Sequence, residues 1–450
     1  MNPLDLIAAL IVLVGLLVNT VPMIPIAAMG AAALRGTSTR LQHWLGFKKV
    51  EWAIVVCLAY WLVNFFWTRQ PLSELITYDF LRNDGAMLIS YTAFIFFLGW
   101  PLKAKYCRWF WLVFLTVLSG VAAVGAAISL NLPYSGLLEP LGVVGTEMVG
   151  AQEQGAGGMF FGWYRAHNTA GGVYAVAVVL ALALAQEPKL GWKPRIFRRA
   201  LVVACLVGLI LTYSRGAWVG FVAGAAVVLP IRKLGQTMKV ALLIGVPAVL
   251  IAAMSSSVVS RLDTFSDPYT GTAADRLDLW AEAWNDFTNS PVVGMGYGRY
   301  NDLFEQFAGV KGIIWVATKG IVESNDSHAH NSYLHFLAEG GVLGLWVSMF
   351  VWWCAWKELS FFESHFPRSQ LYWLERAAKA GLVVALVQAL TEHIIGRGSV
   401  VLILDALLGM TLAAARFELR AARAAAKKAA VAIPSELPGV GRRPFVAARS

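Results

Sequence analysis

Residues 327–344 read SHAHNSYLHFLAEGGVLG, and they mark the point at which a long polar stretch gives way to a run apolar enough to enter a bilayer. Three of the seven histidines of the chain, His328, His330 and His335, fall in this stretch. Because the unperturbed imidazole pKa lies near 6.5, histidines at such a boundary can exchange protons at neutral pH. We therefore expect a membrane span to begin here, next to a functional site.

The composition indicates an integral membrane protein. The 450 residues are 58% hydrophobic and 14% charged, with a mean hydropathy of +0.61, well outside the range of ordinary globular domains. The net charge of +10 does not indicate nucleic-acid binding, because Lys and Arg fall mainly in short connections between apolar runs, where they set orientation. The four cysteines show no metal-ligand spacing, so neither a zinc site nor a disulfide framework is expected.

Apolar runs predict about twelve transmembrane helices, each of roughly 17–25 residues or slightly fewer. The runs cover residues 4–18, 21–34, 50–67, 85–100, 109–130, 168–185, 200–213, 216–231, 240–254, 333–356, 375–395 and 400–415. The first two are either separate spans or one helix kinked around Pro22 and Pro25. The first run lacks the basic flank of a cleaved signal peptide, so we expect it to be retained. The predicted fold class is an all-α polytopic membrane protein.

Charge distribution predicts the orientation of these spans. Alternate connections carry Lys and Arg, as in residues 35–49, 103–108, 189–199 and 232–239, and the positive-inside rule places them in the cytoplasm. The chain then divides into spans one to nine (1–254), a periplasmic loop or small helical cap (255–332), the last three spans (333–416) and a basic cytoplasmic tail (417–450).

Two helices are expected in the cap. The first begins near Thr272, and an apolar stripe on it is formed by Leu277, Trp280, Ala281, Trp284 and Phe287. The second is short and covers residues 300–308. Between them, the G-x-G-x-G pattern at 294–298 has no preceding strand and is explained by turn chemistry rather than by dinucleotide binding.

Two arginines on the predicted outer side are candidates for binding phosphate. Arg215 lies in a tight turn between two spans, where it is either an interfacial anchor or a planar fork for phosphate oxygens. Arg276 lies in the first turn of the cap helix, where it either pairs locally with Asp275 or Asp278 or supplies a second guanidinium to the same anion.

The histidines supply a candidate general base. His330, with Asn331 next to it, is the first choice, and His328 is its partner or substitute, because a base needs one ring nitrogen held by a hydrogen bond and the other free. His335 and Glu339 are four residues apart on one helix and are expected to pair structurally.

Two further polar clusters border predicted spans on the same side. One contains Arg165, His167 and Asn168, and the other contains Glu392, His393 and Arg397. Either cluster could line the cavity that holds the two arginines and the histidine pair, and no carboxylate cluster suited to a metal ion is evident outside the membrane.

Taken together, these motifs resemble the O-antigen ligase and polymerase superfamily of integral-membrane glycosyltransferases. The resemblance is carried by TYSRGAW at 212–218, DRLDLWAEAW at 275–284 with SPVVGMGYG at 290–298, and HAHNSYLHFLAEGGVLG at 328–344. FGWYRAHNTAGG at 161–172 is a looser match. One departure is Trp280, which stands where the family often has leucine.

The resemblance implies an inverting, metal-independent O-antigen ligase without a cofactor, acting in lipopolysaccharide biosynthesis at the periplasmic face of a bacterial inner membrane. Its donor would be a polysaccharide on undecaprenyl pyrophosphate and its acceptor a hydroxyl of the lipid A core. Arg215, Arg276 and His330 match the family's catalytic residues, although the HAH sequence leaves His328 and His330 as alternatives. Substrate binding is expected to involve His328, Asn331, Arg165, His167 and Asn168.

Other functions remain open on these motifs. A polymerase would use a second lipid-linked glycan as its acceptor, and a protein oligosaccharyltransferase would use Ser or Thr. A transporter or flippase would also have about twelve spans, but internal repeats and interrupted helices near the midplane, which are typical of transporters, are not clear in this sequence.

Overall fold

The computed structural model describes residues 3–17, 48–67, 86–100, 103–130, 132–133, 144–145, 159–160, 162–164, 166–188, 191–229, 272–300, 328–367, 369, 371–395 and 398–432. These residues are helical apart from turns, connections and one antiparallel pair of two-residue strands, β1 (Val144–Gly145) and β2 (Met159–Phe160). The helices are α1 (Pro3–Leu17), α4 (Lys49–Trp67), α7 (Ala86–Gly99), α8 (Ala104–Ser129), α9 (His167–Ala185), α10 (Trp192–Leu211), α11 (Arg215–Val228), α15 (Thr272–Asn289), α17 (Ser332–His365), α18 (Tyr372–Gln388) and α19 (Ser399–Ala432).

The predicted helical fold is confirmed in the described residues apart from the β1–β2 pair, but the predicted number of about twelve spans is not confirmed. Each expected span overlaps a helix except 21–34 and 240–254, which lie outside the described residues, as does most of the expected helix at 300–308. Within the described part of the chain, five helices are long and apolar enough to cross a membrane, namely α4, α8, α9, α17 and the 399–428 part of α19, and α7 and α11 contain shorter apolar segments. The span predicted at 375–395 is wrong at its end, because α18 stops at Gln388 and residues 389–395 form a turn.

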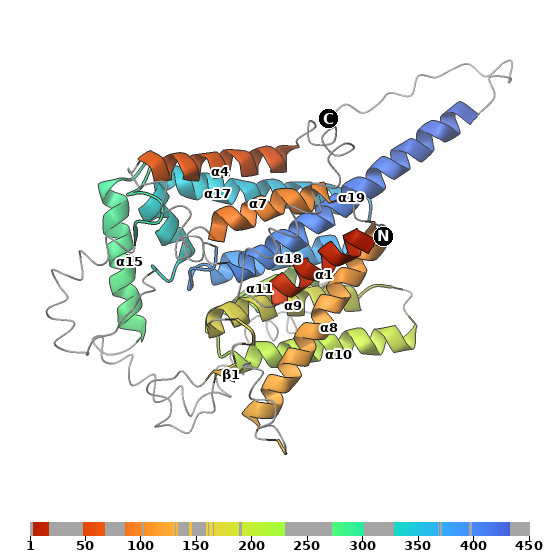
Figure 1. The fold of residues 1–450 in the computed structure, drawn as a ribbon, viewed down its shortest axis with the longest axis horizontal. Coiled ribbons are helices and arrows are strands. Elements are labelled where there is room, and N and C mark those ends of the chain that lie inside the picture. The colour runs from red at the N-terminus through yellow and green to blue at the C-terminus, as the bar shows by residue number, and fades with distance from the viewer. Residues whose placement is uncertain are drawn as a thin grey trace, which may run out of the picture.

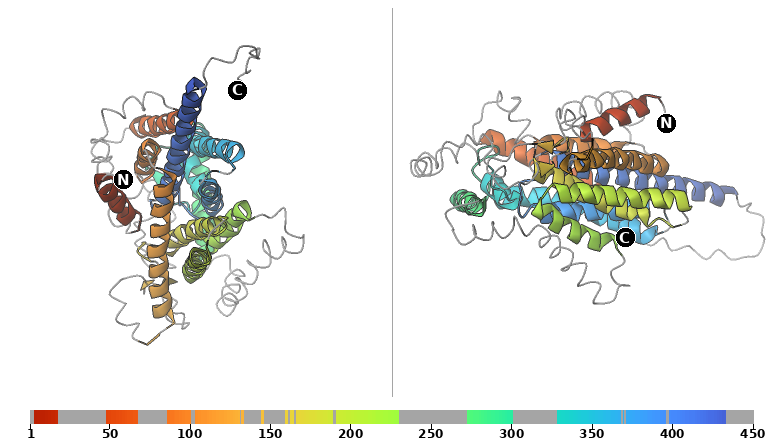
Figure 2. Two further views of the ribbon diagram at one scale, coloured as in Figure 1. Left: turned by 90° about the vertical axis from the view of Figure 1, so that its right-hand side faces the viewer. Right: turned by 90° about the horizontal axis from the view of Figure 1, so that it is seen from below.

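The helices form a bundle with α19 and α9 at its centre (Figures 1 and 2). The apolar window of α19 is 94% buried and that of α9 is 78% buried, which is unusual for spans that face lipid. Small residues allow this close packing: a Cβ on Gly224 of α11 would lie 2.6 Å from Val384 of α18. Interfaces rich in small residues are typical of helices that associate within a membrane.

The two ends of the bundle differ in charge. At one end, α15 lies across the bundle, near the first turn of α17 (Figure 1). At the other end, the buried guanidinium of Arg416 pairs with Glu51 and Glu358, joining α19, α4 and α17. The basic extension of α19 leaves the bundle at this second end.

A break in α17 lets a loop add backbone hydrogen bonds to it. Within α17, Gly341 has φ +61° and ψ −164°, a conformation that essentially only glycine adopts. The break frees backbone groups that pair with residues 291–296: Val342 N–H donates to the carbonyl of Pro291 (2.9 Å), and Met295 N–H donates to that of Ala338 (2.8 Å). From α4, the side chain of Asn64 bonds the carbonyl of Val293 and the N–H of Tyr297.

The glycines in this contact leave no room for side chains. A Cβ on Gly341 would lie 2.4 Å from the carbonyl carbon of Val292, and one on Gly294 would lie 2.2 Å from that of Glu339. The turn prediction for 294–298 is confirmed, since Gly294, Gly296 and Gly298 all have positive φ.

Replacing Gly341 with alanine should therefore destabilise the protein, by about 1–3 kcal/mol from backbone strain alone and by more from the clash. Thermal unfolding of the purified protein measures this. The matched control is Gly120→Ala in α8, where a Cβ meets nothing within 4 Å. Equal unfolding temperatures for the two variants would contradict the backbone pairing described here.

The apolar stripe of α15 is not the buried face of the helix throughout. Trp284 is 53% exposed, and Ala281 is exposed as well, whereas Glu282, Ala283 and Asp286 are buried. The buried face of α15 therefore carries polar side chains, and it meets polar groups at the start of α17.

Candidate functional site

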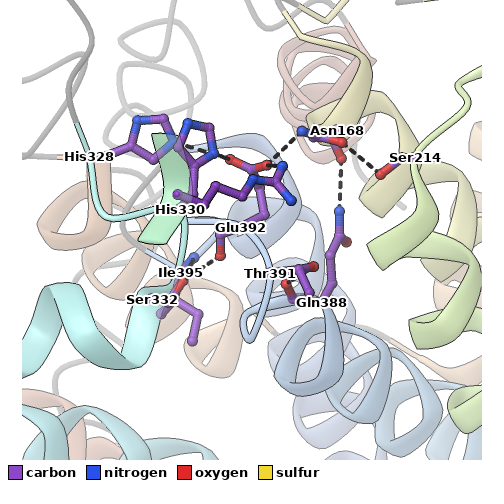
Figure 3. Close-up of polar contacts among 10 residues, drawn as sticks. Asn168, Ser214, His328, His330, Ser332, Gln388, Thr391, Glu392 and Ile395 are labelled. Atoms are coloured by element: carbon purple, nitrogen blue, oxygen red, sulfur yellow. Dashed lines mark hydrogen bonds and ion pairs between the residues drawn. The ribbon is translucent and has the colours of Figure 1, made fainter. Parts of the chain in front are cut away.

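One carboxylate lies at the centre of the polar groups above α17. Glu392, in the turn between α18 and α19, receives both candidate histidines on the same oxygen, Oε1: His328 Nε2 at 3.1 Å and His330 Nδ1 at 2.9 Å. Its other oxygen, Oε2, accepts a hydrogen bond from Asn168 Nδ2 at 2.6 Å. Figure 3 shows the two imidazoles on one side of this carboxylate and Asn168 on the other.

The start of α17 is tied to the turn that carries Glu392. Asn331 caps the helix, its side-chain oxygen accepting from the N–H groups of Tyr333 and Leu334. Ser332 Oγ donates to the carbonyl of Glu392 and accepts from the N–H of Ile395. His330, immediately before the cap, has φ +45°, which is a strained value for a residue with a Cβ. Its hydrogen bond to Glu392 helps to hold this backbone conformation.

Both arginines reach the same end of the bundle by different routes. Arg276, in the first turns of α15, places Nη2 3.8 Å from Glu392 Oε2. Arg215 is the first residue of α11 and follows Ser214, whose Oγ donates to Asn168 Oδ1 at 2.9 Å. The next residue of α11, Gly216, packs so closely on the Glu392 turn that a Cβ there would lie 2.2 Å from Thr391 Oγ1.

The charge state of Glu392 follows from its partners. Burial by itself would raise the pKa of this carboxyl, but the hydrogen bonds and charges of His328 and His330 hold its pKa well below the usual range. Glu392 is therefore ionised at any working pH. An ionised carboxylate can only accept hydrogen bonds, so each histidine nitrogen that faces it donates.

The two histidines differ in access. The side chain of His330 is 30% exposed, whereas that of His328 is 10% exposed. With Nδ1–H donated to Glu392, the neutral ring of His330 carries its lone pair on Nε2. This combination of a held nitrogen, a second nitrogen with a lone pair and an accessible ring is what a general base needs.

The remaining predicted residues have different places in the structure. Asn168 is bonded to Glu392, and Asn331 is the cap of α17. His167 begins α9 beside Asn168. Arg165 and Arg397 lie outside the described residues. The structural pair predicted for His335 and Glu339 is confirmed, with Nε2 3.4 Å from Oε2.

The hub of the site, Glu392, was not among the residues selected from the sequence as catalytic or substrate-binding. It is 62 residues from His330 along the chain, and no local spacing connects the two. The available signal in the sequence was a carboxylate followed by a histidine next to an apolar run. An ionised carboxylate at such a position is costly unless its charge is paired.

His328, His330 and Glu392 also place their ligand atoms within 4.8 Å of one another, close enough for the group to hold a metal ion. Two imidazoles and a carboxylate form a donor set that zinc accepts. No metal was expected from the sequence, so the arrangement makes a metal requirement a question for experiment.

A second set of buried carboxyl groups fixes α15 to α17. Asp286 and Glu282 of α15 lie near Glu339 of α17, and Tyr300 links the helices, its N–H donating to Glu339 Oε1 and its hydroxyl donating to the carbonyl of Leu279. Burial, with the negative charges of Glu282 and Glu339, raises the pKa of Asp286 to about 7. The docked helix thus favours the protonated form of Asp286.

The docking of α15 should therefore weaken with rising pH. Because the pKa of Asp286 is higher in the folded than in the unfolded chain, stability falls as pH rises from about 4 to about 7 and stays low above that. The variant Asp286→Asn should unfold about 2–4 °C higher than the wild type at pH 8 and show a smaller difference at pH 5. Asn285→Asp, exposed on the same helix, is the control. If the unfolding temperature of Asp286→Asn exceeds that of the wild type by the same amount at pH 5 and pH 8, the raised pKa of Asp286 is contradicted.

Comparison with known proteins gives one match. The sequence model of a family described as O-Antigen ligase matches residues 200–349, a third of the chain. The matched region contains Arg215, Arg276, His328 and His330, whereas Asn168 and Glu392 lie outside it. No curated protein matches the sequence.

Proposed function

We propose that this chain is an O-antigen ligase, which transfers a polysaccharide from undecaprenyl pyrophosphate to a hydroxyl of the lipid A core. The match of residues 200–349 to the O-antigen ligase family model supports this proposal. The apolar helices together with the family indicate a multi-pass membrane protein and a glycosyltransferase-like enzyme of O-antigen processing. We further propose the bacterial inner membrane as its location. The positive-inside rule supports a site on the periplasmic side, because the basic end of the bundle lies opposite α15.

The observation that carries this proposal is the sharing of Glu392. Its carboxylate accepts from His330 and lies near Arg276, so a base and a phosphate-binding group from separate elements meet around one side chain. A polar link continues through Asn168 to Ser214, directly before Arg215. A transferase that breaks a glycosyl phosphate bond needs a base for the acceptor and cations for the leaving group.

His330 serves as the base in this mechanism. Its Nε2 takes the proton of the acceptor hydroxyl as that oxygen attacks the anomeric carbon of the donor sugar. Attack from the side opposite the diphosphate inverts the anomeric configuration. Glu392 accepts from Nδ1 throughout and stabilises the imidazolium that forms, as a carboxylate does for histidine in other proton-transferring sites.

Arg215 and Arg276 act on the leaving group. When the bond between the anomeric carbon and the phosphate oxygen breaks, the electron pair stays on undecaprenyl diphosphate. Guanidinium groups bind phosphate oxygens in a bidentate manner and remain charged at all working pH values. Arg276 lies 3.8 Å from Glu392 with its side chain 31% exposed, so donors remain for the diphosphate.

Replacing either arginine with alanine should abolish transfer, with a loss of about 10²-fold or more for removal of one charge-stabilising group. Lysine at position 276 should recover only part of the activity, since it lacks the planar fork. Transfer of labelled glycan in proteoliposomes is the assay. Arg199→Ala, an exposed arginine at the basic end, should behave as wild type. Near-normal transfer by both Arg215→Ala and Arg276→Ala would exclude the diphosphate clamp.

His330→Ala should lower kcat by about 10²–10⁴, the range typical of a general base, and His328→Ala should have a smaller effect because its ring is less accessible. Glu392→Gln should be severe, while Glu392→Asp should restore part of the activity by keeping the negative charge. If His328→Ala proves the more damaging of the two histidine variants, the base is His328.

The acceptor is tested by reconstitution with a defined lipid-linked donor. Three acceptors are compared: lipid A core, a second donor molecule and a protein with accessible Ser and Thr. Product on lipid A core alone is expected; elongation of the donor would make the protein a polymerase, and glycoprotein would make it a protein transferase. Each assay is repeated in excess EDTA, where full activity is expected, and a strict metal requirement would give the His328, His330 and Glu392 group a metal-binding role.

A further inference from the structure

A pocket lies at the end of the bundle opposite Glu392. Its walls come from the last turns of α17, the first turn of α18 and the part of α19 where the helix leaves the core, and its volume is about 410 Å³. Since the part of α17 after the break at Gly341 rises about 1.5 Å per residue over residues 342–365, the pocket lies roughly 35 Å from that break. The pocket is therefore separate from the proposed transfer site.

The pocket combines apolar walls with acidic groups. Phe362 and Phe366, whose ring centroids are 6.3 Å apart, line it together with Leu419. Its carboxyl groups are those of Glu375 and Glu418. The described lining residues include neither lysine nor arginine, and their one basic side chain is that of His365.

Glu375 is the informative residue. It is 1% exposed, and its Oε2 has no hydrogen-bond partner among the described residues. A buried carboxyl oxygen without a partner is costly in a folded protein and calls for an explanation such as a missing ligand. Glu363 and Glu418 act on Glu375 electrostatically as negative charges, and Lys379 acts on it as a positive charge.

Nearby cations are already engaged. Lys379 pairs with Glu363, and Arg376 hydrogen-bonds the hydroxyl of Tyr372 and the carbonyl of Val227. Glu418 accepts a hydrogen bond from Ser369 at 2.9 Å, which orients its carboxylate at the pocket wall. A ligand that completes this site must bring positive charge and N–H or C–H donors.

We infer that this pocket binds an ammonium group carried on a partly apolar body, with the cation held between Glu375, Glu418 and the rings of Phe362 and Phe366. Carboxylates neutralise such a cation, and aromatic faces attract it in the manner known for ammonium ligands. The ammonium can belong to the headgroup of phosphatidylethanolamine or to a soluble amine. Both present the same group to Glu375.

Binding is measured by native mass spectrometry of the purified full-length protein, with phosphatidylethanolamine, phosphatidylglycerol or soluble ethanolamine added separately. Wild type should bind the phosphatidylethanolamine or the ethanolamine at least tenfold more tightly than phosphatidylglycerol. Glu375→Gln removes the charge, and Ala422→Trp fills the pocket; each should lower this binding tenfold or more. Ala421→Trp changes the neighbouring residue of α19, which does not line the pocket, and should bind as wild type.

The outcomes show whether the pocket binds a lipid headgroup or a soluble amine, and whether it selects an ammonium group at all. Retention of phosphatidylethanolamine without binding of ethanolamine supports a lipid headgroup, and binding of ethanolamine supports a soluble amine. Equal affinity for all three probes, or unchanged binding in both Glu375→Gln and Ala422→Trp, overturns the inference. His330→Ala should bind the amine probes as the wild type does, so this test does not depend on whether the protein transfers glycan.

Discussion

The hydrogen bonds from His328 and His330 to one oxygen of Glu392 are the interaction on which the proposed site depends. They give hydrogen-bond partners to a buried carboxylate, and they fix the histidine rings against the turn between α18 and α19. The same carboxylate meets Arg276 from α15 and Asn168 from α9. Four segments that are far apart in the sequence therefore have one common point, and movement of any of them changes the geometry of the base.

A rigid scaffold keeps this common point in place. The break at Gly341 allows residues 291–296 to add backbone hydrogen bonds to α17, and Asn64 of α4 holds the same residues from the other side. Since α15 leads directly into residues 291–296, the position of Arg276 follows from a backbone contact. Glycine is needed at 294 and 341 because two main chains approach each other there. This gives a physical reason for the glycines in the two motifs that resemble those of the O-antigen ligase family.

How far sequence reasoning reached depended on whether an interaction was local. Helices were predicted well because apolar runs are continuous, and the pairing of His335 with Glu339 follows from helical spacing alone. The role of Glu392 could not be predicted in the same way, because its partners come from α9, α15 and the start of α17. The buried face of α15 could not be predicted from hydrophobicity, because it carries the acidic residues Glu282 and Asp286, which lie near Glu339 of another helix.

The boundaries of α18 illustrate the same limit. Residues 375–395 read as one apolar run, yet the helix ends at Gln388, because Ser332 bonds the backbone of the turn at Glu392 and Ile395. Periodicity shows where a helix is possible, while a tertiary contact decides where it stops. Glu392 lies between Gln388, where α18 ends, and Ile395, where the apolar run ends.

The central claim is that one imidazole and two guanidinium groups surround a diphosphate next to Glu392. A cryo-EM structure of the protein bound to undecaprenyl diphosphate tests this most directly. The account predicts diphosphate oxygens within hydrogen-bonding distance of both Arg215 and Arg276, with His330 still bonded to Glu392 and its Nε2 facing the sugar site. A diphosphate bound away from either arginine, or a His330 ring turned from Glu392 in the complex, would contradict it.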